Sequence, residues 1–180
     1  MAAFPPRTLD TLRLHLRPGT LADAQAIFDS YATDPEVVRY LCFRPHQSLA
    51  DTRVFLEAVE RAWESGEGER ALVIVHRDLG RIVGAIGIRK AGPRVEVGYV
   101  LERARWGEGL MTEVVVAVRD AAFADPDVSR FQALCDVENV ASARVMEKAG
   151  MVLEGTLRSY EIHPNRSEVP RDCWCYAVVR

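Results

Sequence analysis

A glycine-rich stretch at residues 105–112, Arg-Trp-Gly-Glu-Gly-Leu-Met-Thr, has the types and spacing that suit ligand chemistry. Glycine lets the backbone come close to a ligand, and the amides of a first helical turn are unpaired and point outward. Together with the dipole of the following helix they form a site for an anion such as a pyrophosphate. The stretch lacks the Gly-Lys-[Ser/Thr] of a Walker A loop and the third glycine of a dinucleotide fingerprint. A glycine-rich helix entry without a ligand is the alternative interpretation.

A second polar pair lies further along the chain. Asn139 and Ser142 are three residues apart on a predicted helix, so their side chains share one face. Asn139 is equally suited to capping that helix. A ligand contact and a capping role are equally good interpretations of Asn139, and the two are compatible.

No pattern in the sequence predicts a metal site. The chain has four cysteines, of which Cys173 and Cys175 flank a tryptophan. A zinc site needs further cysteine or histidine ligands at suitable spacing, and none is near. We therefore interpret the pair as small apolar side chains on one face of a strand.

The elements that must position these residues follow from hydrophobic periodicity. Strands are predicted at residues 12–17, 71–76, 82–88, 95–102, 131–135, 152–157 and 173–179. Helices are predicted at residues 20–28, 48–63, 109–124 and 139–149, with a short helical turn at 34–40. The buried face of the third helix is predicted to be Leu110, Val114, Val118 and Ala121. Because strands and helices mix without strict alternation, we expect an α+β fold with one mostly antiparallel sheet and a parallel crossover through the third helix.

The bulk properties limit the class of protein. A length of 180 residues with 48% hydrophobic residues predicts a single domain over residues 1–180. A net charge of -3 disfavours nucleic acid as a partner. The N-terminus does not read as a secretory signal, and no apolar run approaches the roughly 20 residues that span a bilayer. We expect a cytoplasmic protein with no membrane partner.

Three motifs in order resemble the GNAT superfamily of acetyltransferases. They are residues 96–101 (Glu-Val-Gly-Tyr-Val-Leu), 106–113 (Trp-Gly-Glu-Gly-Leu-Met-Thr-Glu) and 139–150 (Asn-Val-Ala-Ser-Ala-Arg-Val-Met-Glu-Lys-Ala-Gly). The resemblance runs from Leu12 to Arg180 and is nearest to the RimJ/RimL branch, which acetylates the N-termini of ribosomal proteins. It implies a mixed, mostly antiparallel sheet, flanked by helices, whose two central parallel strands splay apart.

The resemblance also implies that acetyl-CoA lies in that gap, with no metal involved. The usual turn starts with Gln or Arg and closes with Gly or Ala, where this chain has Trp106 and Met111. Since the implied contacts are to the backbone, binding is expected to persist. The implied cofactor residues are Val100, Leu101, Trp106, Gly107, Glu108, Gly109, Leu110, Met111, Thr112, Asn139 and Ser142.

Acid–base roles follow from the same resemblance. Many superfamily members carry a tyrosine as the acid at the position of Met146, which cannot donate a proton. In the RimJ/RimL branch the implied group near the thiolate is Ser142, although a small residue that lets the helix approach is nearly as good an account. Glu161 is the implied base and Glu96 the second choice, each with an exposed or ion-paired acid as the alternative. His163 ranks below both.

The expected reaction is direct attack of a primary amine on acetyl-CoA in a ternary complex. A protein or peptide N-terminus is the favoured acceptor, and a groove open at both ends would support it. The alternatives are a small amine (aminoglycoside, polyamine or amino acid), which an acidic groove would favour, and a catalytically silent acyl-CoA-binding module. A homodimer is left open as a further option.

Overall fold

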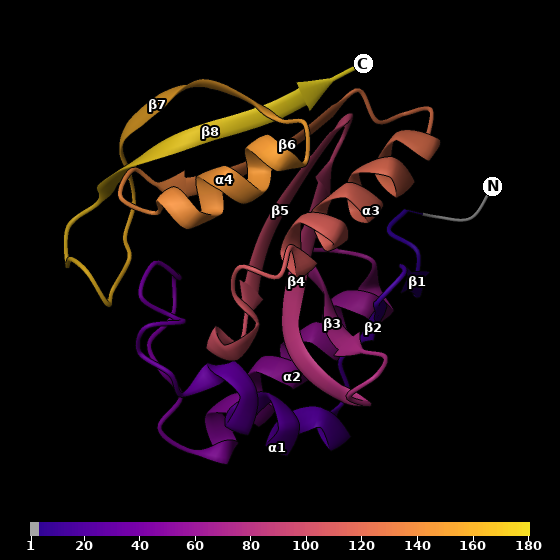
Figure 1. The fold of residues 1–180 in the computed structure, drawn as a ribbon, viewed down its shortest axis with the longest axis vertical. Helices are drawn as coiled ribbons and strands as arrows, with labels where there is room; N and C mark the ends of the chain where they lie inside the picture. Colours follow the sequence, from indigo (N-terminus) through magenta and orange to yellow (C-terminus); the bar gives the residue numbers. More distant parts are fainter. Residues whose placement is uncertain (1–3) are drawn as a thin grey trace.

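The computed structural model describes residues 4–180, and one eight-stranded sheet runs through it (Figure 1). The strand order is β1-β2-β3-β4-β5-β6-β8-β7, and all neighbours are antiparallel except β5 and β6. This agrees with the predicted α+β fold. The strands are β1 (Leu9–Asp10), β2 (Leu14–Pro18), β3 (Arg70–His76), β4 (Arg81–Ala91), β5 (Arg94–Leu101), β6 (Arg130–Asp136), β7 (Val152–Glu161) and β8 (Arg171–Val179).

Two long helices form where their sequence signals are strongest. The α2 helix (Leu49–Ser65) starts at Ser48, whose backbone N–H donates to the Asp51 carboxylate at 3.0 Å. It ends at Gly66, which takes a left-handed φ of 73°. The α3 helix (Leu110–Ala124) and the shorter α4 helix (Val140–Lys148) lie within a residue or two of the predicted ranges.

The segment between β2 and α2 differs from the prediction. Residues 20–28 were expected to form one helix, but the chain passes through a 3₁₀ turn η1 (Leu21–Asp23), a short α1 (Ala24–Ile27) and a π-helical turn η2 (Phe28–Ala32). The expected short helical turn at 34–40 is present as a single turn, closed by a hydrogen bond from the Val38 N–H to the Asp34 carbonyl at 3.1 Å, but it does not continue as a helix. Ile27 and Tyr31, four residues apart in this segment, are both buried in the core.

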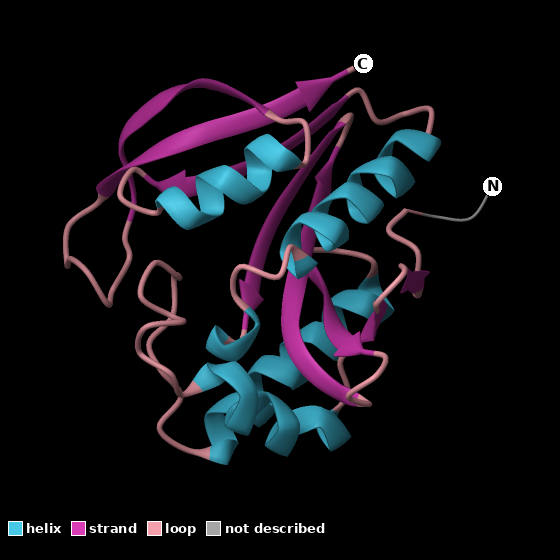
Figure 2. Ribbon diagram, viewed as in Figure 1, coloured by secondary structure: helices cyan, strands magenta, loops and turns pink. Residues whose placement is uncertain are grey.

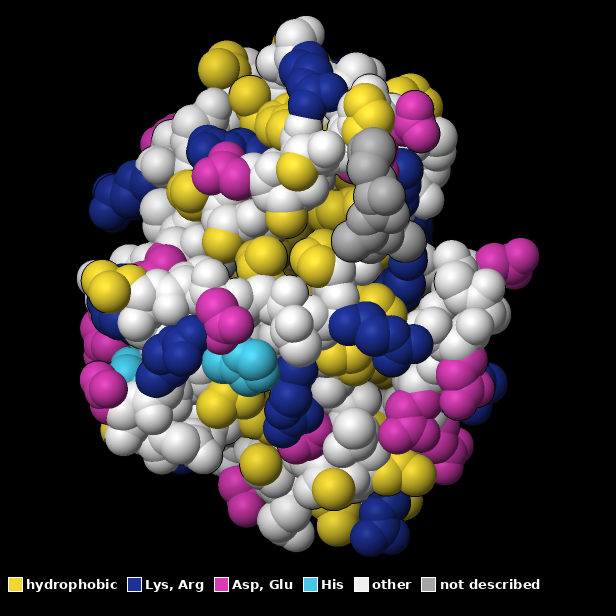
Figure 3. All heavy atoms as spheres, turned by 90° about the vertical axis from the view of Figure 1, so that its right-hand side faces the viewer, with side chains coloured by type: hydrophobic (Ala, Val, Ile, Leu, Met, Phe, Trp, Pro, Cys, Tyr) yellow, Lys and Arg dark blue, Asp and Glu magenta, His cyan; other side chains and the backbone are white. Residues whose placement is uncertain are grey.

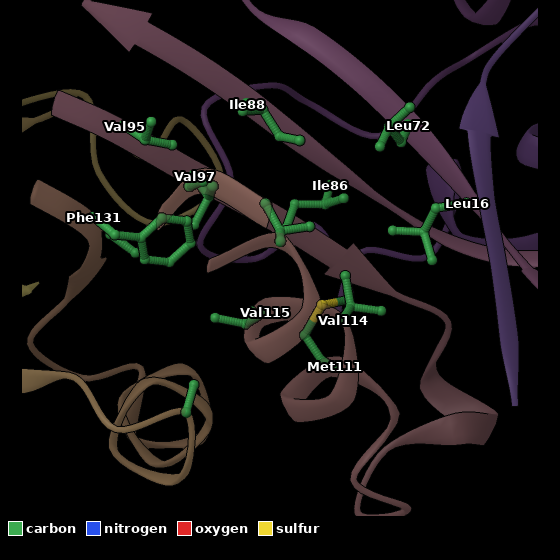
Figure 4. Close-up of a cluster of buried hydrophobic side chains, with 14 of the residues drawn as sticks. Leu16, Leu72, Ile86, Ile88, Val95, Val97, Met111, Val114, Val115 and Phe131 are labelled. Atoms are coloured by element: carbon green, nitrogen blue, oxygen red, sulfur yellow. The ribbon is translucent and has the colours of Figure 1, made fainter. Parts of the chain in front are cut away.

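The α3 helix packs on one face of the sheet together with α4 (Figures 2 and 4). Leu110, Val114 and Val118 are buried as predicted, but Ala121 is only partly buried and Ala122 takes its place. The buried stripe continues along i+4 spacing, and Met111 and Val115 widen it. A smaller cluster on the opposite face joins α1 and α2 to the other side of β3 and β4.

The parallel pair of strands separates partway along. Register pairs join residues 94–97 of β5 to residues 130–133 of β6, yet β5 continues to Leu101 and β6 to Asp136. The two strands diverge beyond this point in Figure 1. This confirms the predicted splay, and it leaves one edge of β5 and one edge of β6 without a partner strand.

The molecular surface carries both signs of charge. On the face that Figure 3 shows, basic and acidic side chains are interspersed and do not gather into one basic stripe. Across residues 4–180, no helix is long and apolar enough to cross a membrane.

Candidate active site

Two cavities meet at the splay between β5 and β6. The first has a volume of about 490 Å³ and is bordered by residues 105–112 and α4. The second has a volume of about 300 Å³ and is bordered by the opposite sheet face, the end of β7 and the loop before α2. Five residues line both cavities: Tyr40, Leu41, Tyr99, Asn139 and Ser142. Two ligands, one in each cavity, would therefore touch at these side chains.

The turn before α3 has the geometry of an anion site. Gly107 and Gly109 adopt left-handed φ values of 81° and 77°, which glycine reaches without strain. The first α3 bond runs from the Glu113 N–H to the Gly109 carbonyl at 3.1 Å. The amides of Leu110, Met111 and Thr112 precede it and have no helical acceptor. All three residues line the first cavity, and the first two side chains are buried, so the backbone is what they present.

Neighbouring side chains hold this turn in place. The Trp106 indole Nε1 donates to the Leu101 carbonyl at 2.8 Å, tying the turn to the end of β5. Arg13, which directly precedes β2, donates to the Glu108 carbonyl at 3.0 Å and to the Glu113 carboxylate at 2.8 Å. Glu108 does not line the cavity, unlike the rest of the predicted turn. Sequence patterns did not single out Arg13, because its partners lie about 100 residues away.

Four basic side chains line the first cavity. Two of them are paired with acids: Arg39 lies 3.6 Å from Glu36, and Arg105 lies 3.1 Å from Glu108. Arg144 and Lys148 have no ion-pair partner among residues 4–180 and stand four apart on α4, so they share one face. Both lie in the motif at 139–150, and their spacing is a signal that the sequence analysis left unused.

The free edge of β5 presents backbone groups to the gap. The Glu102 N–H donates to the Val83 carbonyl of β4 at 2.7 Å. Since peptide groups alternate in direction along a strand, those of Tyr99 and Leu101 point the other way, toward the gap. Val100 lines the first cavity, but its peptide group faces β4. The Leu101 carbonyl already accepts the Trp106 indole, which leaves the Leu101 N–H for a ligand.

The start of α4 lies across the gap from this edge. Asn139 caps α4 by accepting the Ser142 N–H at 3.2 Å, and it also lines both cavities, so both predicted roles are compatible with its position. The Ser142 hydroxyl lies 2.9 Å from the Tyr99 hydroxyl. Burial raises the pKa of Tyr99 and the Ser142 bond only partly opposes this, so the phenol keeps its proton at neutral pH. Met146 is fully buried and lines neither cavity.

Three carboxylates line the second cavity. Glu161 ends β7, and Glu96 accepts the Gln132 amide at 2.6 Å. Glu69, which the sequence analysis did not select, lies 3.9 Å from Arg89. The structure thus brings the two predicted bases together and adds a third acid.

A bulge in β7 sets the position of Glu161. Leu157 pairs with Cys173 and Glu161 with Arg171, so β7 has two more residues than β8 over this stretch. Ser159 within it has a left-handed φ of 48°, and its N–H donates to Asp172 at 2.8 Å. The predicted strand at 152–157 stops short of this bulge.

Histidine and cysteine side chains add polar groups to the same region. His163 lines the second cavity, and its Nε2 lies 3.7 Å from both the Asp136 carboxylate and the Cys173 sulfur. Cys173 is buried, Cys175 is half-buried, and both are free thiols. Within residues 4–180, no group of three or more potential ligands is placed to hold a metal ion.

Comparison with known proteins identifies the fold. Residues 13–152 match the family model described as an acetyltransferase (GNAT) domain. The chain belongs to the GNAT acetyltransferase family. An uncharacterized N-acetyltransferase p20 of Bacillus licheniformis is 31% identical over 157 residues, covering 86% of this chain and 87% of the relative.

Solved structures agree with this assignment. A GNAT-family acetyltransferase from Bacillus anthracis superposes with a TM-score of 0.83 at 25% identity, covering 96% of this chain and 98% of that one. RimL, a ribosomal L7/L12 α-N-protein acetyltransferase in complex with coenzyme A, superposes with a TM-score of 0.83 at 20% identity, covering 96% and 97%. This GNAT chain is an N-acetyltransferase. A further structural neighbour, the microcin C7 self immunity acetyltransferase MccE, is in complex with acetyl-CoA and AMP and superposes with a TM-score of 0.83 at 20% identity, covering 94% of each chain.

Proposed function

We propose that this GNAT enzyme moves the acetyl group of acetyl-CoA to a primary amine by direct attack in a ternary complex. The observation that carries the proposal is the pair of cavities that share Tyr99, Asn139 and Ser142 at the splay. A thioester in the first cavity and an amine in the second would meet there without a covalent enzyme intermediate.

The first cavity has the groups that acetyl-CoA requires. The free amides of Leu110, Met111 and Thr112 suit the pyrophosphate, and the cations Arg144 and Lys148 suit its negative charge. The free β5 edge at Leu101 offers a backbone partner for the amide-containing pantetheine arm. These residues fit the cofactor that the family implies.

The reaction needs a base that accepts a proton, a hydrogen-bond donor to the developing oxyanion, and a group that stabilises the leaving thiolate. Glu161 takes one proton of the incoming ammonium, and the neutral nitrogen attacks the thioester carbonyl. The C–S bond then breaks, and the nitrogen loses its second proton to water as the amide forms. The Leu101 N–H stabilises the charge that builds on the carbonyl oxygen. The thiolate leaves beside Ser142, whose hydroxyl donates a hydrogen bond, and it takes its proton from water. The protonated phenol of Tyr99 orients that hydroxyl and is a positioning residue.

A protein or peptide N-terminus is the favoured acceptor. The likeness to RimL supports it, as do the two cavities on opposite sides of the sheet. A small polycationic amine is the second candidate, which the three carboxylates of the second cavity favour. Cytoplasmic location, a single domain over residues 1–180 and homodimer formation stay predictions.

The experiment is an acceptor screen with release of free thiol from acetyl-CoA as the readout. N-terminal peptides, polyamines and aminoglycosides are each offered at one concentration. We expect amine-dependent thiol release with at least one class. Binding of acetyl-CoA, seen as a rise in melting temperature, without thiol release from any amine would instead support a silent acyl-CoA-binding module.

A further inference from the structure

Residues 39–43 form a loop that borders both cavities. Tyr40 and Leu41 line the first and the second cavity, and Cys42 lines the second. Among the described residues, the loop makes one backbone–backbone hydrogen bond, from the Leu41 N–H to the Val38 carbonyl at 2.9 Å. A segment with so few bonds of its own opens easily unless another part of the chain holds it.

One side chain from the loop between β7 and β8 holds the 39–43 loop at both ends. The Asn165 Nδ2 donates to the Val38 carbonyl and to the Phe43 carbonyl, each at 2.7 Å. Both hydrogens of that amide are used in this way. Val38 is fully buried whereas Phe43 is 38% exposed, so Asn165 ties an exposed end to an anchored one. In Figure 1 the two loops lie beside each other at the left of the molecule.

Asn165 is presented from a well-defined turn. The Arg166 N–H donates to the His163 carbonyl at 2.8 Å, and His163 is buried. Pro164 precedes Asn165 in this turn, and its ring fixes one backbone dihedral angle. The Arg166 guanidinium lies 5.6 Å from the centre of the Tyr40 ring, within the range of a cation–π contact. The turn therefore contacts the 39–43 loop at its ends and in its middle.

We infer, on the basis of the proposed function, that Asn165 positions the 39–43 loop as the wall at which the amine meets the thioester. Asn165 lines neither cavity, so it is a positioning residue that acts through Tyr40 and Leu41. Without its amide, the Phe43 end of the loop is free to move and the space at the junction of the cavities is no longer fixed. The turn before α3 and the cations of α4 belong to other elements, so binding of acetyl-CoA should change little.

The first test needs no acceptor. Asn165→Ala removes both hydrogen bonds, and Asn165→Asp keeps the size of the side chain but sets acceptor oxygens against two carbonyls. Trypsin cleavage after Arg39, identified by mass, should be at least about 5-fold faster in either variant than in wild type, because it follows the population of the opened loop. Cleavage after Arg119 within α3 reports global unfolding and should not change.

The matched control variant is Gln47→Ala. The Gln47 side-chain amide also donates to a backbone carbonyl, that of Pro45 at 3.0 Å, and Gln47 lines neither cavity. Cleavage after Arg39 and acceptor kinetics should both match wild type in this variant.

The second test uses the most active amine of the acceptor screen. We expect kcat/KM for that amine to fall about 10-fold in both Asn165 variants, mainly through KM, because small displacements of reacting groups are costly. Calorimetric titration should give acetyl-CoA affinity and a number of sites equal to wild type. Partial unfolding would instead lower the number of acetyl-CoA sites and leave the acceptor KM unchanged.

The outcomes distinguish this inference from the proposed function. Wild-type kcat/KM in folded Asn165→Ala and Asn165→Asp overturns the inference while transfer to amines stands, and so does wild-type cleavage after Arg39. An equal loss of acceptor and acetyl-CoA affinity overturns it too, since the loop would then not serve the acceptor in particular. Absence of thiol release from wild type with every amine overturns the proposed function itself.

Discussion

At the scale of single residues, the proposed reaction depends on Tyr99, Ser142 and Glu161. The Tyr99–Ser142 contact of 2.9 Å would hold the serine hydroxyl beside the leaving sulfur. Glu161 lines only the second cavity, from which the amine would arrive in the proposed reaction. Proton removal and thiolate stabilisation would then belong to residues on different sides of the junction.

We expect Glu161→Gln to lower turnover by roughly 10²- to 10⁴-fold, the usual contribution of a general base, with little change in acetyl-CoA affinity. Gln keeps the shape of Glu but cannot accept the proton. The measurement is kcat of wild type and variant at saturating acetyl-CoA and amine. Glu154→Gln, on the same strand but outside both cavities, is the control. An unchanged kcat would move the role to Glu96 or to a water chain.

The sequence analysis found part of this constellation. Asn139 and Ser142 follow from helical spacing, and Glu161 from the family resemblance. Tyr99 lies within the 96–101 motif but received no role of its own, because its contact with Ser142 spans 43 residues of sequence. Glu69 was not selected either, since its place against Gly87 and along the second cavity exists only in the folded sheet. Tertiary pairing of this kind leaves no local pattern.

At the scale of elements, β5 joins the two halves of the site. Its free edge at Leu101 faces the first cavity, while Glu96 and Gly98 border the second cavity. A strand alternates its side chains between faces, so one short segment can border both ligands.

A larger side chain at Gly98, in the second cavity, should weaken binding of the acceptor without affecting binding of acetyl-CoA. Gly98→Val places a side chain in open space, so we expect the acceptor KM to rise about 10-fold while acetyl-CoA affinity stays unchanged. The measurement is initial rate over acceptor concentration, together with calorimetric titration of acetyl-CoA. Gly155→Val on β7 also meets nothing within 4 Å and lies outside both cavities, which makes it the matched control. A loss of acetyl-CoA affinity in Gly98→Val alone would contradict the assignment of the cavities.

Element prediction worked where local signals agreed. Helices α2, α3 and α4 have clear periodicity, β3 and β4 have apolar runs, and β5 alternates apolar with other residues. The helix predicted at residues 20–28 is helical over residues 21–27, but its winding changes along the way and it continues as a π-helical turn to Ala32, which no propensity rule predicts. The bulge at Ser159 was missed for the same reason, since pairing with β8 imposes it.

At the scale of the whole molecule, buried ion pairs connect distant segments. Glu102, 5% exposed, accepts two bonds from Arg81 at 2.6 and 2.8 Å and one from Ser30 at 3.1 Å. Burial opposes the charge, but the Arg81 contacts outweigh it and hold the pKa of Glu102 below its usual value of 4.5. Because the pKa is lower in the folded state, this contact stabilises the fold above about pH 4.5 and is lost as the pH falls below it.

Glu102→Gln should therefore destabilise the protein by about 1–3 kcal/mol at neutral pH, the range for hydrogen bonds to charged groups. The difference from wild type should shrink as the pH falls from about 4.5 toward the lower folded pKa, because the unfolded wild-type chain takes up a proton before the folded protein does. Urea unfolding of both proteins at pH 7 and pH 3.5 measures it, with the exposed Glu67→Gln as control. An equal loss of stability at both pH values would show that packing, and not charge, is responsible.

The assignment of a ligand to each cavity depends on acetyl-CoA binding at the turn before α3. One titration tests that binding most directly. Gly107 and Gly66 have φ values of 81° and 73°, and a Cβ at either meets nothing within 4 Å, so an aspartate causes comparable backbone strain at both. Only Gly107→Asp adds negative charge beside the proposed pyrophosphate. Calorimetric titration with acetyl-CoA should show affinity about 10-fold weaker in Gly107→Asp, or about 1.4 kcal/mol, and unchanged in Gly66→Asp. Wild-type affinity in a folded Gly107→Asp protein would contradict the account.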